Sequence, residues 1–166
     1  MPFGFTHMLL AYVTGKVIVS VKKIKVDYLF WFFLILGGIL PDGDFVLDWL
    51  FGLGLHRTYS HSLLFALVAG FGVYYVFKKF DFKNSKVLGL GVCLGILVHI
   101  IADVITTSSC GGPAVLWPVG LYFARNMVCD TAVRGFHEGS FNWAIIDMGI
   151  GAAWFLYLIV RHKIEL

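Results

Sequence analysis

The sequence predicts an all-α fold: a multi-pass membrane helical bundle of about five helices, some of them short, with a metal site at its extracytoplasmic end. Composition is the first reason. Hydrophobic residues make up 59% of the 166 residues and charged residues 14%, whereas soluble domains contain about 45–50% and about 25%. The mean hydropathy of +0.85 points the same way. The length fits a single domain over residues 1–166.

Regularly spaced apolar segments are the second reason. They cover residues 8–21, 28–40, 62–77, 87–106 and 143–160. A membrane-spanning helix needs about 20 apolar residues, in a range of about 17–25. The last two segments are therefore long enough, and the first three are marginal alone. A soluble all-helical domain is the alternative, but the segments lack the apolar stripe of the usual width.

Glycines recur inside the apolar segments. Small residues let helices approach closely in lipid, so we expect these glycines to lie at helix contacts. They are Gly37, Gly38, Gly70, Gly72, Gly89, Gly91, Gly95, Gly149 and Gly151.

The lysines predict the orientation in the membrane. They occur at Lys16, in the turns 22–25 and 78–86, and at Lys163. If the segments alternate in direction, these turns share one side, which the positive-inside rule makes cytoplasmic. The N-terminus and the loops 42–61 and 106–142 then face the extracytoplasmic side of the cell membrane. The net charge of +3 is small and scattered, so no nucleic-acid partner is expected.

Two further residue types fall in those outer loops. Arg57, Arg125 and Arg134 are there, and a guanidinium matches phosphate or carboxylate geometry; for the last two, contact with lipid headgroups is an equal alternative. Cys110 and Cys129 also lie there, where a disulfide is chemically permitted.

Side chains that bind metals gather on the same side. They are His7, Asp42, Asp44, Asp48, His56, His61, His99, Asp103, His137 and Glu138. His99 and Asp103 are four residues apart, so they share one face of a helix. His56 and His61 suit a loop that leads into a helix, with Ser60 as the expected N-cap. Ionisable groups at membrane depth are costly and face a cavity, a partner or an ion.

Together these residues predict a metal site rather than isolated polar side chains. Imidazole and carboxylate ligands suit zinc, manganese or iron better than calcium or magnesium. The set is large enough for one or two ions, with Asp103 as the candidate bridge. Of the three aspartates that follow the second apolar segment, Asp42 is the expected metal ligand, because Pro41 ends the helix just before it. Asp44 is a further ligand or a group that orients a histidine, and Asp48 is expected to face water.

Four motifs carry a family resemblance: "GGILPDGD", "HRTYSHSLLFAL", "HIIADVIT" and "GPAVLWP". Together they resemble the YdjM-like family of membrane-bound metal-dependent hydrolases, over residues 7 to about 118. That family is in turn similar to the zinc-dependent phospholipase C and single-strand nuclease superfamily. The resemblance implies metal ligation by His7, Asp42, His56 or His61, and His99 with Asp103. The superfamily's later histidines and glutamate have no clear counterpart here except His137 and Glu138.

The predicted chemistry is hydrolysis by metal-activated water, on a phosphoester or other ester. Arg57 and Asp44 are the expected catalytic side chains, with Arg57 holding a phosphate oxygen. The site's place at the membrane surface favours a lipid or lipid-linked substrate over a small-molecule phosphoester. Metal-ion transport and a non-catalytic, metal-stabilised membrane protein are the alternatives.

The stretch "SSCGGPAVLWPVGLYFARN" (residues 108–126) is uncharged up to Arg125. Its Pro113 and Pro118 exclude a regular span. It is expected either to line the substrate pocket or to anchor at the interface, with Trp117 at headgroup level.

Overall fold

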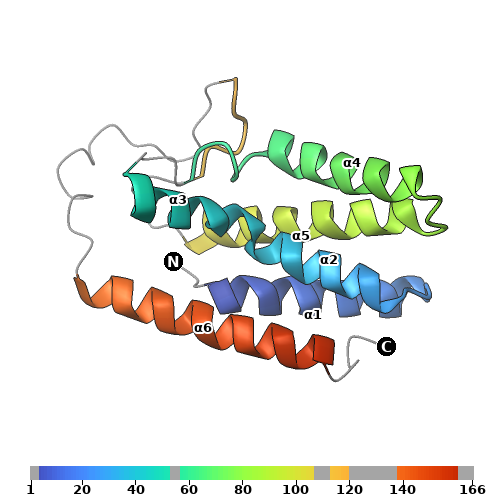
Figure 1. The fold of residues 1–166 in the computed structure, drawn as a ribbon, viewed down its shortest axis with the longest axis horizontal. Coiled ribbons are helices and arrows are strands. Elements are labelled where there is room, and N and C mark those ends of the chain that lie inside the picture. Colours follow the sequence, from blue (N-terminus) through green and yellow to red (C-terminus); the bar gives the residue numbers. More distant parts are fainter. Residues whose placement is uncertain (1–3, 53–56, 107–112, 120–137, 161–166) are drawn as a thin grey trace.

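The computed structural model describes residues 4–52, 57–106, 113–119 and 138–160 (Figure 1). Every regular element in these residues is a helix, which confirms the all-α prediction. The elements are α1 (Gly4–Lys22), α2 (Tyr28–Ile39), the 3₁₀ turn η1 (Leu40–Asp42), α3 (Gly43–Phe51), α4 (Leu63–Lys79), α5 (Ser85–Thr106) and α6 (Glu138–Val160). Each predicted apolar segment coincides with a helix, and α3 is an additional short one.

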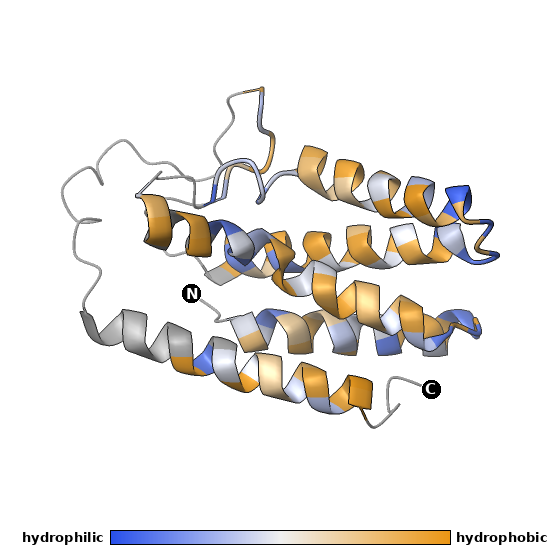
Figure 2. Cartoon of the chain, in the orientation of Figure 1, coloured by the Kyte–Doolittle hydropathy of each residue, from blue (hydrophilic) through white to orange (hydrophobic). Residues whose placement is uncertain are grey.

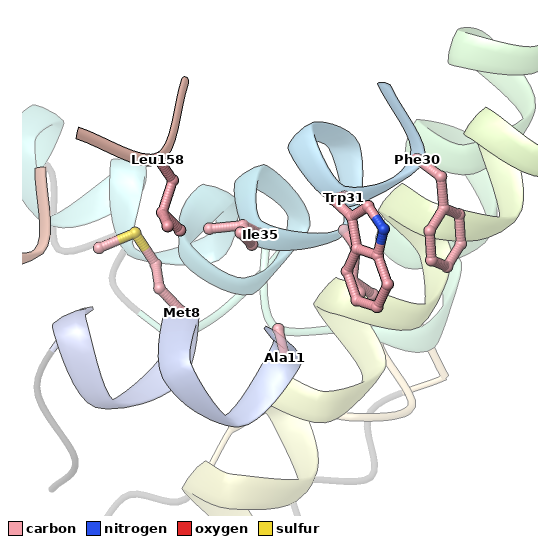
Figure 3. Close-up of a cluster of buried hydrophobic side chains, with 7 residues drawn as sticks. Met8, Ala11, Phe30, Trp31, Ile35 and Leu158 are labelled. Carbon is pink, nitrogen blue, oxygen red and sulfur yellow. The ribbon is translucent and has the colours of Figure 1, made fainter. Parts of the chain in front are cut away.

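The helices lie side by side along the long axis of the molecule (Figure 1). α5 packs against α1, α2 and α4, and α1 packs in addition against α2 and α6. The main core lies among α1, α2 and α6 (Figure 3). Its buried members are Met8, Ala11, Phe30, Trp31, Leu34, Ile35 and Leu158. A second cluster joins α4 to α5 through Ala66, Val92, Ile96 and Ile100.

Glycines bring α2 and α5 into backbone contact. A Cβ atom at Gly95 would collide with the carbonyl oxygen of Leu34 and lie 2.8 Å from the amide nitrogen of Gly38. Gly70 and Gly89 approach each other in the same way between α4 and α5. The prediction fails for Gly72 and Gly149, where a Cβ would meet nothing within 4 Å, because these residues lie away from the contacting faces.

The helices are rich in hydrophobic residues (Figure 2), and many of the large ones are exposed. On α4, Leu67, Phe71 and Tyr75 are each at least 60% exposed. Among the described residues, Gly4–Lys22 and Ser85–Ile105 are long and apolar enough to cross a membrane, whereas Tyr28–Asp42 and Gly149–Val160 are shorter apolar helices. The first segment is thus longer than predicted. The multi-pass arrangement stays a prediction.

The two ends of the bundle differ in chemistry. One end holds the α1–α2 and α4–α5 turns, where hydrophilic residues are prominent (Figure 2). Asp27 caps α2 there by accepting a hydrogen bond from the Phe30 amide at 3.0 Å, and its second oxygen accepts one from Asn84 at 3.1 Å. The other end brings together the start of α1, η1, the start of α4 and the end of α5 (Figure 1).

Candidate metal centre

Five of the predicted ligands meet at this second end of the bundle. His7 comes from the first turn of α1, Asp42 from η1, His61 from the residues before α4, and His99 and Asp103 from successive turns of α5. The three histidines are at most 1% exposed, and Asp103 is 2% exposed. His56 and His137 lie outside the described residues, as do Cys110 and Cys129. The side chains of Asp48 and Glu138 are also outside the described part.

Four donor atoms of this cluster face one another. The Nε2 atoms of His61 and His99 are 3.1 Å apart. Oδ2 of Asp103 lies 3.4 Å from the first and 3.8 Å from the second. Oδ1 of Asp42 lies 3.7 Å from His61 Nε2 and 3.5 Å from His99 Nε2.

These separations match a metal site better than direct ion pairs. Charge-assisted hydrogen bonds bring nitrogen and oxygen to about 2.7–2.9 Å, which is closer than any imidazole–carboxylate pair in the cluster. Ligands about 2.0–2.1 Å from a tetrahedral zinc ion lie about 3.3–3.4 Å from one another. The donor set of two imidazoles and two carboxylates therefore fits a divalent metal such as zinc in both chemistry and spacing.

A backbone carbonyl fixes the orientation of His99. Nδ1 of His99 lies 2.8 Å from the carbonyl oxygen of Gly38, and because a carbonyl only accepts, Nδ1 carries the proton. The other nitrogen, Nε2, then presents its lone pair to the cluster, as a metal ligand must. The sequence gives no side-chain signal for this partner, because the acceptor belongs to a glycine.

Asp103 lies between two groups of histidines. While its Oδ2 faces His61 and His99, its Oδ1 lies 3.4 Å from Nε2 of His7. The rings of His7 and His99 stack with centroids 3.8 Å apart. Two overlapping sets have their donor atoms close enough to share an ion: His7, Asp42 and His99, and His61, His99 and Asp103. These two sets share His99, whereas Asp103 faces His7 with one oxygen and His61 and His99 with the other, so its role as the bridging carboxylate stays a prediction.

Asp44 contacts the outer nitrogen of His61 rather than the centre of the cluster. Its Oδ2 lies 3.3 Å from His61 Nδ1 and accepts hydrogen bonds from the Ser60 hydroxyl and, at 3.2 Å, from the Arg57 amide. Of the two roles expected for Asp44, this geometry favours orienting a histidine, because a carboxylate on the outer nitrogen fixes the tautomer of a metal ligand.

The N-cap of α4 differs from the prediction. Ser62, not Ser60, caps the helix: its backbone is extended, and its hydroxyl accepts a hydrogen bond from the Phe65 amide at 3.1 Å. The hydroxyl of Ser60 is engaged by Asp44 instead. His61 consequently lies just before the helix, where it can turn toward α5.

Arg57 is held beside the cluster by its backbone. Its φ of 65° is uncommon for a residue with a side chain. Its amide donates to Asp44, and its carbonyl accepts from the Ala114 amide at 3.0 Å. Burial lowers the pKa of Arg57 from its usual value, and the carboxylates of Asp103, Asp42 and Asp44 oppose that shift.

Part of the segment after α5 packs on this same loop. Beside the Ala114–Arg57 hydrogen bond, the Leu63 amide donates to the Val115 carbonyl at 2.9 Å, and the rings of Tyr59 and Trp117 meet edge-on with centroids 4.8 Å apart. The described residues 113–119 thus lie next to the segment that carries Arg57 and His61.

Zinc binding at about pH 7.5 is expected to displace at least about one proton, from His61. Burial lowers the pKa of this imidazole, but its contacts with Asp42 and Asp44 dominate and raise it to about 9. In the metal-free protein, His61 therefore stabilises the fold fully below its ordinary pKa, and the contribution is lost as pH rises through about 9.

Calorimetric titration in two buffers of different ionisation enthalpy measures the displaced proton directly. The number of protons released per zinc ion should fall when the titration is repeated at about pH 10, because His61 is already neutral there. A binding enthalpy that is the same in both buffers would contradict the assignment.

The comparison with known families agrees with the motifs. A family model described as YdjM inner membrane protein matches residues 1–163, which extends well beyond residues 7–118 that carry the four motifs. No curated protein and no solved structure matches the chain. A match over nearly the whole sequence shows the family, and the chain belongs to the YdjM inner membrane protein family.

Proposed function

We propose that this protein is a membrane-bound, metal-dependent hydrolase that uses water to cleave a phosphoester or other ester. One observation carries the proposal: three buried imidazoles, the buried carboxylate of Asp103 and the half-buried carboxylate of Asp42 converge at one end of an apolar bundle, beside an arginine. The proposal includes a multi-pass topology in the cell membrane, with this end on the extracytoplasmic side.

In the proposed site, His61, His99, Asp42 and Asp103 hold a divalent metal. Zinc fits best, and manganese or iron is compatible with the same ligands. His7 and Oδ1 of Asp103 offer a place for a second ion. When bound, such a metal activates water near neutral pH and offsets the negative charge of a phosphoryl group. His56 remains a proposed additional ligand.

The side chains around the metal ligands have separate tasks. Asp44 keeps His61 oriented through the Nδ1 contact. Arg57 binds an anionic oxygen of the substrate, since a guanidinium donates paired hydrogen bonds to phosphate. Neither group replaces water as the nucleophile.

The surroundings of the cluster favour a lipid or lipid-linked substrate. Tyr59, Leu64, Leu116 and Val119 are between 36% and 78% exposed, and they lie on segments that adjoin His61 and Arg57. Exposed apolar side chains beside a polar cluster suit the boundary between headgroups and acyl chains. The substrate would then present its ester at the depth where the metal ligands lie.

Arg57→Met is expected to lower kcat/KM for a chromogenic phosphodiester about 100-fold, as loss of a transition-state donor does, while the metal content stays that of the wild type. Arg57→Lys keeps the charge but not the paired donors, so its kcat/KM should lie between that of Arg57→Met and that of the wild type. Steady-state kinetics with metal analysis of each preparation tests this. Equal activity of Arg57→Met and wild type would contradict the role.

A non-catalytic metal site is the second candidate, and one observation favours it. Both nitrogens and both oxygens of the four-donor set lie about as close as the ligands of a closed tetrahedral site, which in a four-coordinate metal leaves no position for water, whereas the proposed hydrolase needs a fifth coordination position. Ion transport has weaker support, because the stretch "VLGLGVCLGIL" that precedes His99 in α5 carries no charged side chain.

A screen separates these candidates. Purified protein loaded with zinc or manganese is tested on phosphodiester, phosphomonoester and carboxylic ester substrates, including phospholipid vesicles, with His99→Ala as the control. Hydrolysis by the wild type that the variant lacks supports the enzyme. Metal-dependent thermal stability with no turnover on any substrate would favour the non-catalytic site, and metal uptake into proteoliposomes would favour transport.

A further inference from the structure

Asp147 is an acidic residue in the apolar helix α6, outside the metal cluster. Its carboxylate oxygen Oδ2 accepts a hydrogen bond from the backbone amide of Phe5, with nitrogen and oxygen 2.6 Å apart. The two residues are 142 positions apart in the sequence. A carboxylate in an apolar helix is costly, so its use in holding a backbone amide of another helix requires an explanation.

The hydrogen bond belongs to a continuous contact between α6 and α1. A Cβ atom at Gly151 would lie 3.1 Å from Cα of Phe5. The ring of Trp154 meets the edge of Phe5 at a centroid distance of 5.5 Å and that of Tyr12 at 5.8 Å. With Leu158 in the core, these α6 residues recur every three or four positions and share one face. Asp147 is the polar end of this face.

The hydrogen bond acts on the first turn of α1. Amides in the first turn of a helix have no acceptor within the helix, and Phe5 is the second described residue of α1, close to the N-terminal end of that helix. Asp147 supplies an acceptor from a different helix and places a negative charge at the positive end of α1. The bond therefore ties the first described turn of α1 to α6.

His7 lies in this same turn of α1, two residues after Phe5. Its Nε2 must stay near Oδ1 of Asp103, now 3.4 Å away, for the two to share an ion. We propose that Asp147 is a positioning residue, which acts through the first turn of α1 to hold His7 at the metal centre. This inference rests on the metal site of the proposed function, and it assigns α6 a role in that site although α6 supplies no ligand from its described side chains.

The test is a double-mutant cycle with Co²⁺, whose visible absorption responds to ligand geometry. Asp147→Ala is expected to weaken Co²⁺ binding about tenfold, as loss of an outer support of a ligand does, and to change the absorption in the same sense as His7→Ala. In the His7→Ala background, Asp147→Ala should cause no further loss, because the residue it positions is gone. Asp147→Asn keeps an acceptor oxygen and should retain most of the affinity.

Leu158→Ala is the matched control. Leu158 lies on the same face of α6 but at its other end, so its truncation should lower the melting temperature and leave Co²⁺ affinity unchanged. If Asp147→Ala does not fold, Phe5→Pro and Phe5→Ala carry the test: both remove the ring, but only proline removes the amide, in a first turn that tolerates it. Weaker Co²⁺ binding by Phe5→Pro than by Phe5→Ala supports the inference.

The outcomes separate the inference from the function on which it rests. No Co²⁺ binding by the wild type would refute the metal site itself and the inference with it. Binding by the wild type that Asp147→Ala leaves unchanged, or equal losses with and without His7, would overturn the positioning role alone. Equal affinities of Phe5→Pro and Phe5→Ala would do the same.

Discussion

Asp103→Asn is expected to abolish tight metal binding while the helical bundle still folds. Its two oxygens face His7 on one side and His61 and His99 on the other, so the substitution removes a shared anionic ligand at nearly constant volume. Loss of an outer-shell partner costs about 10–100-fold in metal affinity. Loss of this carboxylate should lower the metal affinity by more than that factor.

The shift in melting temperature on adding zinc to chelator-treated protein measures the effect. A metal that binds only the folded state stabilises it in proportion to the logarithm of the metal concentration divided by Kd. Zinc should therefore raise the melting temperature of the wild type markedly and that of Asp103→Asn hardly at all. Asp81→Asn is the control, because Asp81 is exposed and lies in the turn at the opposite end. An equal zinc-induced gain in Asp103→Asn and wild type would refute the ligand assignment.

Gly95→Ala is expected to be the most damaging single-methyl change in the core. The new Cβ would meet the Leu34 carbonyl and lie 2.8 Å from the Gly38 amide nitrogen and 2.9 Å from the Gly37 carbonyl carbon. The backbone atoms of α2 cannot rotate away as a side chain can, so α2 and α5 must separate. Overpacking of this kind costs about 1–3 kcal/mol, and we expect the upper end, about 3 kcal/mol, against a gain of about 0.5–1 kcal/mol from helix propensity.

Gly72→Ala is the matched control, because a Cβ there meets nothing within 4 Å. It should leave the melting temperature of detergent-solubilised protein unchanged or raise it, whereas Gly95→Ala should lower it. Gly95 is also one turn before His99, so separation of the helices should lengthen the bond between His99 and Gly38 and weaken zinc binding. The same melting temperature for both alanine variants would show that α2 and α5 are not in backbone contact.

Much of the site was predictable because its signals are local. The spacing of His99 and Asp103 places them on one helical face wherever the helix lies, and the structure confirms their proximity. Apolar length predicted the longer helices, and the short helix α3 was not among the predicted segments. The placement of the start of α1, η1 and the end of α5 on one side followed from the expected alternation in direction of the apolar segments.

Other parts depend on tertiary contacts that a sequence does not display. Ser60 looked like the cap of α4, but Asp44 binds its hydroxyl and Ser62 caps instead. Gly72 and Gly95 look alike in sequence and differ only in what faces them. The carbonyl of Gly38, which orients His99, has no side chain to reveal it.

The metal content of the purified protein tests the central claim most directly. Elemental analysis of protein prepared without added metal or chelator should find at least about one zinc, manganese or iron per chain in the wild type. Preparations of Asp103→Asn and His99→Ala, made in parallel, should contain far less. Wild-type protein that holds no more of any divalent metal than these two variants would contradict the account.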